Sequence, residues 1–188
     1  MHSRSIVINH LQAIFKHDKV AIACIYCNYK EQAEQTVSSL VASLLKQIIH
    51  DRCAISDNVK WIYKYHSDRN TFPTLDELTR ALESEIEMYS KVFIIVDALD
   101  ECREDDGTRA NLLQALRSLA GTVNLMVTSR DLVSIARDFQ ETKHLDICAN
   151  DQDVRRYIEG RIARTPRRHL KALQESIVKK IVENARGM

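Results

Sequence analysis

Three carboxylates follow a short apolar run in the segment KVFIIVDALDEC, residues 91–102. The run ends at Asp97, and Asp100 and Glu101 come three and four residues later. A carboxylate at the carboxyl end of a buried strand is placed to hold Mg²⁺, which takes one or two carboxylates beside substrate phosphates. Carboxylates just past the strand are placed to orient or deprotonate an attacking water. Asp97 is therefore the predicted metal ligand, and Asp100 and Glu101 are the predicted catalytic acids. The alternative is a set of solvated acids, with Asp97 capping a turn.

A second segment, VNLMVTSR at residues 123–130, ends in groups that suit an anion. A guanidinium at the end of a neighbouring parallel strand is well placed to bind phosphate, which predicts that role for Arg130. Thr128 and Ser129 add hydroxyl groups beside it. The alternative for Arg130 is a surface arginine at a turn between a strand and a helix.

These residues need a sheet to bring them together, and the apolar spacing predicts one. Strands are predicted over Val20–Cys27, Val92–Val96, Val123–Arg130 and His144–Cys148. Helices are predicted over 5–16, 31–49, 59–67, from a capping box at Thr74–Glu77, after Gly107, over 132–139, over 150–164 and from 168. In the last helix, Leu170, Leu173, Ile177 and Ile181 are expected to face inward. This alternation predicts an α/β domain with a parallel sheet over 1–149, followed by the start of a helical subdomain over 150–188.

Composition excludes several classes of protein. The chain has 188 residues and a formal charge of +1, so net charge predicts no partner. The segment 150–188 carries ten bases against five acids, but few aromatic residues lie among its arginines, so we expect no nucleic-acid partner. No apolar stretch reaches the ~20 residues of a membrane helix, so we expect no membrane association. Five cysteines without a secretory signal predict a cytoplasmic or nuclear protein.

The cysteines themselves predict no site. Cys24 and Cys27 have the C-x-x-C spacing, but residues three apart on a strand point to opposite faces, so their thiols diverge. The other three cysteines, Cys53, Cys102 and Cys148, are isolated in the sequence. Buried structural cysteines are therefore expected.

Several of these segments together resemble a known family. VFIIVDALDE is similar to the Walker B segment of the NACHT class of STAND P-loop NTPase domains, in the version of nephrocystin-3-like fungal proteins. IVINHL resembles the helix after the phosphate loop, and NLMVTSRD resembles the sensor-1 strand. The resemblance implies a P-loop NTPase-like sheet that binds ATP or GTP with Mg²⁺. It implies Mg²⁺ coordination by Asp97, water positioning by Asp100 and Glu101, and nucleotide contacts by the Thr128 and Ser129 hydroxyls. For Arg130 it implies either sensing of the γ-phosphate or contact with an acid of the same cluster.

The resemblance also identifies what the sequence does not contain. A phosphate loop of the form Gly-x-x-x-x-Gly-Lys-[Ser/Thr] needs glycines, and the first glycine of this chain is Gly107. The chain thus resembles a piece of a larger signalling switch protein, and this piece is expected to begin just past the lysine of the phosphate loop. We expect weak or absent nucleotide binding, no activity by this chain alone, and lowered stability, with His144–Cys148 either closing the sheet or leaving an open edge.

Two functions follow as expectations. In the first, the intact NTPase domain gates self-association, with flanking winged-helix and repeat modules of a longer protein as partners. In the second, the chain is a degenerate interaction module without catalysis.

Overall fold

The computed structural model describes residues 6–16, 19–50, 55–119, 121, 123–147, 150–164 and 173–185. The chain divides into two compact units, which we call the α/β unit (Met1–Phe139) and the helical unit (Gln140–Met188). Within the described residues, every helix is too short or too polar to cross a bilayer.

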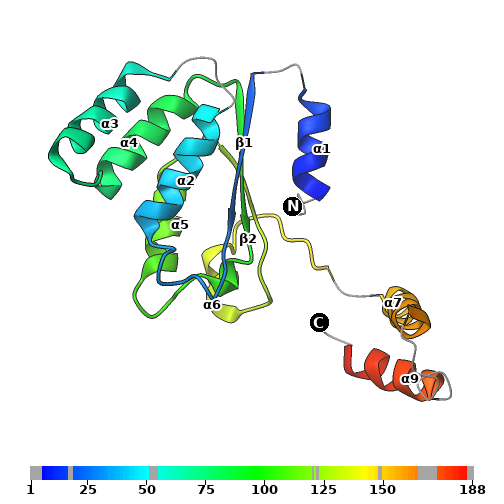
Figure 1. Ribbon diagram of the computed structural model, residues 1–188. Coiled ribbons are helices and arrows are strands. Elements are labelled where there is room, and N and C mark those ends of the chain that lie inside the picture. The colour runs from blue at the N-terminus through cyan, green and yellow to red at the C-terminus, as the bar shows by residue number, and fades with distance from the viewer. Residues whose placement is uncertain are drawn as a thin grey trace. The chain divides into compact units, whose positions relative to one another are not determined.

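The elements of the α/β unit follow the predicted alternation of helices and strands (Figure 1). In chain order they are α1 (Ile6–Ile14), β1 (Val20–Tyr26), α2 (Val37–His50), α3 (Asp57–Arg69), α4 (Leu75–Ile86), β2 (Lys91–Asp97), the 3₁₀ turn η1 (Leu99–Glu101), α5 (Thr108–Ser118), β3 (Val123–Val127) and α6 (Val133–Asp138). The helical unit contains α7 (Asp151–Arg164) and α9 (Gln174–Ala185).

The three strands form a parallel sheet in the order β1-β2-β3. Tyr26 is opposite Asp97, and Val96 is opposite Val127. All three strands therefore end at the same edge of the sheet, which is where α/β proteins place their ligands. The predicted class, an α/β fold with a parallel sheet flanked by helices, is confirmed.

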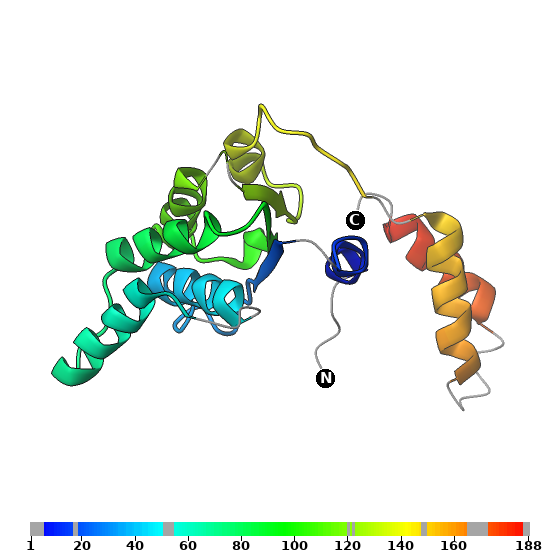
Figure 2. The same ribbon diagram turned by 90° about the horizontal axis from the view of Figure 1, so that it is seen from above.

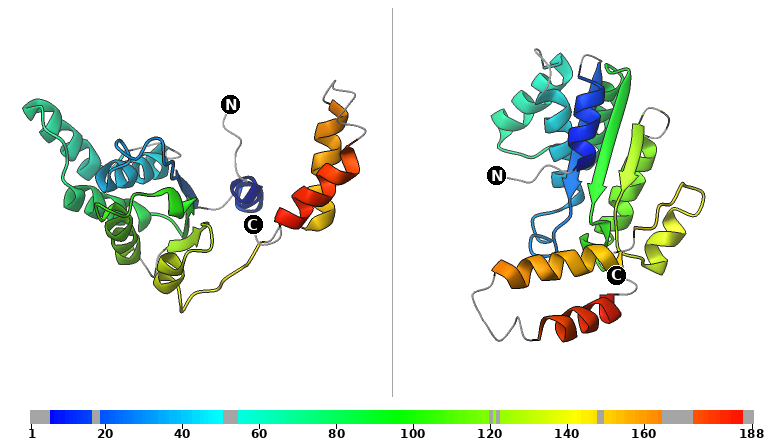
Figure 3. Two further views of the ribbon diagram at one scale, coloured as in Figure 1. Left: turned by 90° about the horizontal axis from the view of Figure 1, so that it is seen from below. Right: turned by 90° about the vertical axis from the view of Figure 1, so that its right-hand side faces the viewer.

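Helices cover the sheet unequally. Helix α2 packs against β1, α4 and α5, and these helices lie on the opposite side of the strands from α1 (Figure 2). Helix α1 contacts the other face of the sheet (Figure 3, right). On that side the rings of Phe15, just after α1, and Phe93 of β2 lie 5.3 Å apart. The main core therefore lies between the sheet and α2, α4 and α5.

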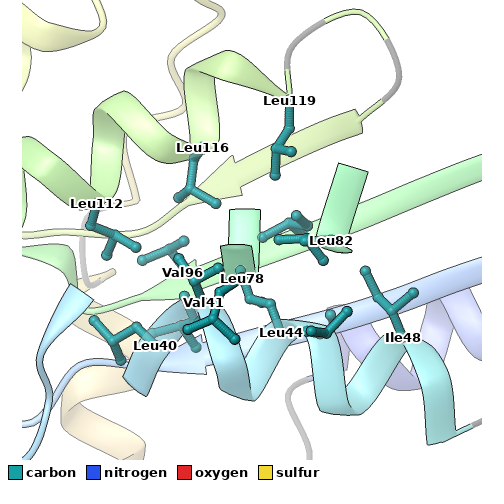
Figure 4. Close-up of a cluster of buried hydrophobic side chains, with 14 of the residues drawn as sticks. Leu40, Val41, Leu44, Ile48, Leu78, Leu82, Val96, Leu112, Leu116 and Leu119 are labelled. Atoms are coloured by element: carbon teal, nitrogen blue, oxygen red, sulfur yellow. The ribbon is translucent and has the colours of Figure 1, made fainter. Parts of the chain in front are cut away.

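That core is made of aliphatic side chains at helical spacing. Figure 4 shows side chains of α2 facing those of α4, β2 and α5. They include Leu40, Val41, Leu44 and Ile48 of α2, Leu78 and Leu82 of α4, Val96 of β2, and Leu112, Leu116 and Leu119 in and after α5. Each of these is less than a tenth exposed.

The outer edge of β1 is closed by two glutamines. The amide of Gln47 in α2 accepts from the N–H of Cys24 at 2.9 Å and donates to its carbonyl at 2.8 Å. Gln35 likewise donates to the carbonyl of Tyr26 at 2.9 Å and accepts from the N–H of Asn28 at 3.0 Å. These side chains satisfy backbone groups that an adjoining strand would otherwise bind.

The helix predicted over 31–49 begins six residues late, at Val37. Residues 28–36 instead form turns, in which the Asn28 side chain accepts from the N–H of Lys30 at 3.1 Å and the Asn28 carbonyl accepts from Glu31 at 3.0 Å. Such local bonds compete with helix formation. The helix predicted from Val37 onward is confirmed, but the helix predicted over the polar residues 31–36 is wrong.

The strand predicted over His144–Cys148 is wrong for its described part. Residues 144–147 form no strand, and Leu145 and Ile147 are each 83% exposed; Cys148 lies outside the described residues. An apolar-polar alternation this short specifies a strand only where another strand or a core receives it. Strand β3 is therefore an edge of the sheet.

The inward face of the last helix also differs from its prediction. Val178 is 1% exposed and packs with Ile158 and Ile162 of α7, whereas Leu173 and Ile181 are 55% and 43% exposed. Leu170, with all of 165–172, lies outside the described residues. Ile177 is partly buried and packs against this core, so the inward prediction is confirmed for Ile177 and wrong for Leu173 and Ile181.

Candidate functional site

The candidate site is the edge where β2 and β3 end. Asp97 is the last residue of β2, and Thr128 follows the last residue of β3. The Thr128 hydroxyl donates to Oδ1 of Asp97 at 2.5 Å and accepts from the N–H of Ala98 at 3.0 Å. Parallel pairing brings these residues together, and one hydroxyl then fixes the rotamer of the Asp97 carboxylate.

The chain turns sharply just after Asp97. Ala98 has φ 56° and ψ 50°, a left-handed conformation that is unusual for a residue with a Cβ. Leu99, which is fully buried, begins the 3₁₀ turn η1 and donates its N–H to the Thr128 carbonyl at 2.9 Å. This strained turn points Asp100 and Glu101 back toward the end of the sheet.

Both carboxylate oxygens of Asp100 accept hydrogen bonds from Arg130. Its Oδ2 accepts from Nε of Arg130 at 2.6 Å, and its Oδ1 accepts from the backbone N–H of Arg130 at 3.1 Å. The Asp100 side chain is 4% exposed, whereas that of Arg130 is 79% exposed. Burial alone raises the pKa of Asp100, but the hydrogen bonds from Arg130 outweigh burial and hold this pKa below its ordinary value. Asp100 raises the pKa of Arg130 in return.

Glu101 is bound to the loop after β1. Its Oε2 accepts from the N–H of Tyr29 at 3.2 Å, and its carbonyl accepts from Nε2 of Gln32 at 2.8 Å. The turns at residues 28–36, which displaced the start of α2, therefore serve as the partner of Glu101. Neither Tyr29 nor Gln32 was predicted, because nothing in their spacing marks them.

The predicted residues are thus brought together with one exception. Asp97, Asp100, Glu101, Thr128 and Arg130 all lie at the carboxyl edge of the sheet. The hydroxyl of Ser129 instead donates to the carbonyl of Arg130 at 2.9 Å.

Sequence reasoning missed a buried guanidinium beside this edge. Arg109 of α5 is 5% exposed, forms an ion pair with Glu104 and donates to the Ser134 hydroxyl at 3.2 Å. It also lowers the pKa of Cys102, although less than the hydrogen bond from the Cys27 thiol does. Cys27 and Cys102 are both buried, as expected of structural cysteines.

The carboxylates do not form a closed metal cage. Within the described ranges, no three His, Cys, Asp or Glu side chains are grouped as a metal site. A cavity of about 450 Å³ lies elsewhere, lined by residues such as Ile86, Lys91 and Asn124. Lys91 begins β2, so that cavity is at the amino ends of the strands and is separate from the carboxylates.

Comparison with known proteins gives one family. The family model described as Nephrocystin 3, N-terminal, matches residues 3–130, which is more than half of the chain and includes every predicted site residue. No curated protein matches the chain. The chain therefore belongs to the nephrocystin 3 N-terminal family.

Proposed function

We propose that the α/β unit supplies the Mg²⁺- and water-binding part of a NACHT-type STAND nucleotide-binding domain of the P-loop NTPase class. The observation that carries this proposal is the Asp97 carboxylate, held by Thr128 where two parallel strands end. In the intact domain, ATP or GTP would control self-association in the cytoplasm, with winged-helix and repeat modules of a longer protein as partners.

The donor set at this edge suits a cation that arrives with its nucleotide. Within the part of the chain that the structure describes, Thr128 bonds to Oδ1 of Asp97 and leaves the second carboxylate oxygen for a metal or its water. Mg²⁺ commonly uses one or two protein carboxylates and takes its other ligands from phosphates and water. When bound, Mg²⁺ would neutralise charge on the phosphates. A single pre-oriented carboxylate suits a Mg²⁺ ion that arrives with the nucleotide better than it suits an ion that the protein holds permanently.

The neighbouring residues have separable roles in this proposal. Glu101, held by Tyr29 and Gln32, would position a water. Asp100 would hold Arg130 until a phosphate competes for the guanidinium. Because the Arg130 side chain is mostly exposed while Asp100 is buried, Arg130 is the partner that can turn toward a ligand.

Nucleotide affinity of this chain is expected to be low. No glycine precedes Gly107, so the sequence holds no glycine-and-lysine loop ahead of β2. Arg130 and Mg²⁺ would offset part of the phosphate charge, but backbone amides of a loop normally supply much of that binding. We therefore propose that this chain alone is inactive as a hydrolase.

Calorimetric titration with Mg-ATP and Mg-GTP tests this proposal in two proteins. One is this chain, and the other is a fusion that places a strand and a Gly-x-x-x-x-Gly-Lys-Ser loop from the same family before Met1. We expect no measurable binding by the chain and micromolar binding by the fusion. In the fusion, Asp97→Asn should weaken Mg²⁺-dependent binding at least tenfold (~1.4 kcal/mol). Asp105→Asn, which changes an exposed acid paired with Arg103, should not.

Micromolar binding by the unfused chain would refute the proposal that nucleotide binding requires the glycine-and-lysine loop. A folded fusion that binds neither nucleotide would refute the NTPase proposal. That second result would favour the other candidate function, a degenerate interaction module without catalysis.

A further inference from the structure

A threonine, a histidine and a glutamate meet where α3 and α4 lie side by side (Figure 1). Thr71 follows the end of α3, and its hydroxyl lies 2.8 Å from Nδ1 of the buried His66. On the other side of the ring, Nε2 of His66 lies 3.2 Å from Oε2 of Glu77, in the first turn of α4. None of these three residues has a role in the proposed nucleotide site, which lies at the carboxyl edge of the sheet.

The two neighbours decide which imidazole nitrogen carries the proton. An ionised carboxylate can only accept a hydrogen, so Glu77 favours a proton on Nε2 of His66. The neutral ring then has its lone pair on Nδ1, and the Thr71 hydroxyl is the donor to it. The three side chains are thus a hydroxyl, a base that can take its proton, and a carboxylate that orients the base.

The backbone and the cap of α4 hold these groups in place. Asn70 ends α3 in the left-handed conformation, with φ 51°, and the N–H of Thr71 donates to the His66 carbonyl at 3.0 Å. Oε2 of Glu77 accepts from the N–H and the hydroxyl of Thr74, at 2.8 and 2.9 Å. The hydroxyl and the carboxylate are therefore held beside the imidazole by bonds that do not involve the ring.

Exposure separates the hydroxyl from its base. Thr71 is exposed, whereas the His66 side chain is 10% exposed and has the Tyr65 ring against it, with centroids 5.1 Å apart. His66 also lies in the last turn of α3, where the helix dipole favours the imidazolium that forms when the base takes a proton. A reagent can therefore reach Thr71 from solvent while the base remains shielded.

We propose that Thr71 is an acylation site that takes an acyl group from an acyl thioester or a similarly activated ester. The Thr71 oxygen attacks the carbonyl carbon, and its proton passes to Nδ1 of His66, while the Glu77 carboxylate stabilises the imidazolium. The tetrahedral intermediate then collapses, the C–S bond breaks, and the thiolate leaves and takes the proton from His66. The products are an ester of Thr71 and a free thiol.

The charge of Glu77 favours this class of donor. A carboxylate beside the base repels an anionic phosphoryl group, whereas the carbonyl of a thioester is neutral. The inference does not depend on nucleotide binding, because it uses no residue of the carboxyl edge.

The test uses the full chain and p-nitrophenyl acetate, whose acetyl group is activated by its aryl leaving group. After brief treatment, the tryptic peptides are sequenced by tandem mass spectrometry. Trypsin releases peptide 70–80, which contains no lysine and includes Thr71, Thr74 and Thr79. We expect an acetyl group on Thr71 and on neither of the other two threonines.

Thr74 and Thr79 are matched controls on the same peptide. The hydroxyl of Thr74 bonds to the Glu77 carboxylate, and that of Thr79 donates to the Leu75 carbonyl at 2.8 Å, rather than to an imidazole. Equal acetylation of the three threonines would overturn the inference, and so would a folded wild-type chain whose peptide 70–80 carries no acetyl group.

Substitution of the base gives the second measurement. His66→Gln should lower acetylation of Thr71 at least about tenfold, because the general base is lost. Glu77→Gln keeps an acceptor for the cap of α4 and should lower acetylation by a smaller factor. His50→Gln, at the exposed end of α2, should leave it unchanged.

Acetylation of Thr71 that persists in a folded His66→Gln chain would also overturn the inference. Far-UV circular dichroism identifies any variant that fails to fold, and the distribution of acetyl groups among the three threonines of the unsubstituted chain then decides the question.

Discussion

At the scale of single residues, one hydroxyl and one unusual turn determine the candidate site. Thr128 bonds at once to the Asp97 carboxylate and to the N–H of Ala98. Ala98 adopts the left-handed conformation that returns the chain toward Asp100. This conformation costs free energy, but burial of Leu99 and the hydrogen bonds to Thr128 hold the backbone in it in the folded state.

Replacing Ala98 tests the strain directly. A non-glycine residue in the left-handed region costs roughly 1–2 kcal/mol, while the extra freedom of glycine in the unfolded chain costs roughly 0.4–1 kcal/mol. We expect Ala98→Gly to raise the free energy of unfolding in urea by about 0.5 kcal/mol, and Ala98→Val to lower it by more than ~1 kcal/mol. Ala110→Gly, in the first turns of α5, should lower it by roughly 0.5–1 kcal/mol. Equal effects of the two glycine substitutions would show that Ala98 is not strained.

The Asp100–Arg130 pair predicts a pH dependence. The folded pKa of Asp100 is depressed below its ordinary value, so the pair adds stability that is complete above the unfolded pKa of about 4. That stability is lost as the pH falls through the folded pKa. We expect Arg130→Gln to unfold at lower urea than the wild type near neutral pH and to converge with it in acid.

Arg137→Gln serves as the comparison for this pH profile, because it removes one positive charge from the nearby helix α6. Its urea midpoint should differ from the wild type by the same amount at each pH. A constant offset for Arg130→Gln as well would mean that Asp100 does not titrate against Arg130.

At the scale of elements, helices α3 and α4 show how local chemistry sets boundaries. Ser56 caps α3, Asn70 ends it in the left-handed conformation, and Thr74 and Glu77 form the predicted capping box of α4. Glu77 also lies 3.2 Å from Nε2 of the buried His66. Hydrogen bonds from the Thr74 N–H and hydroxyl lower the pKa of Glu77, and the nearby His66 ring lowers it further. One side chain thus both starts α4 and fastens it to α3.

Thr74→Ala removes the hydroxyl that accepts from the Glu77 N–H at 3.3 Å. We expect it to lower the free energy of unfolding by about 1 kcal/mol, as is usual for loss of an N-cap. Thr74→Ser retains the acceptor and should remain within a few tenths of a kcal/mol of the wild type. Chemical denaturation followed by circular dichroism measures both, and similar losses in the two variants would assign the effect to the methyl group instead.

At the scale of the whole molecule, the two units differ in the size of their cores. The α/β unit buries side chains from the sheet and from several helices, whereas the buried core of the described helical unit consists of Ile158, Ile162 and Val178. So small a core supplies little free energy to offset the entropy of ordering its helices. The helical unit is therefore expected to unfold first.

A pair of core truncations tests this order of unfolding. Leu44→Ala, at a fully buried position of α2, should cost roughly 2–5 kcal/mol and lower the urea midpoint of the α/β unit. Val178→Ala should reduce helix content without moving that midpoint. Trp61 in α3 reports on the α/β unit by fluorescence. A shift of the Trp61 transition in Val178→Ala would show that the two units unfold together.

Much of the α/β unit could be predicted from its sequence, because each strand is a run of apolar residues and each helix carries a regular stripe. The carboxyl edge was predictable for the same reason, since parallel strands must end together. The missed contacts are those between segments far apart in the chain. Arg109 gave no signal in the sequence, because burial of an arginine depends on partners that sequence spacing does not reveal.

The two glutamines along β1 restrict the side on which a further strand could join the sheet. Gln47 and Gln35 occupy the backbone groups of Cys24, Tyr26 and Asn28 that face away from β2. A further strand would have to displace both amides before it could pair there, whereas β3 presents the opposite border of the sheet. Any extension of this sheet, by more of the same polypeptide or by another molecule, is therefore directed to the side of β3, next to Thr128 and Arg130.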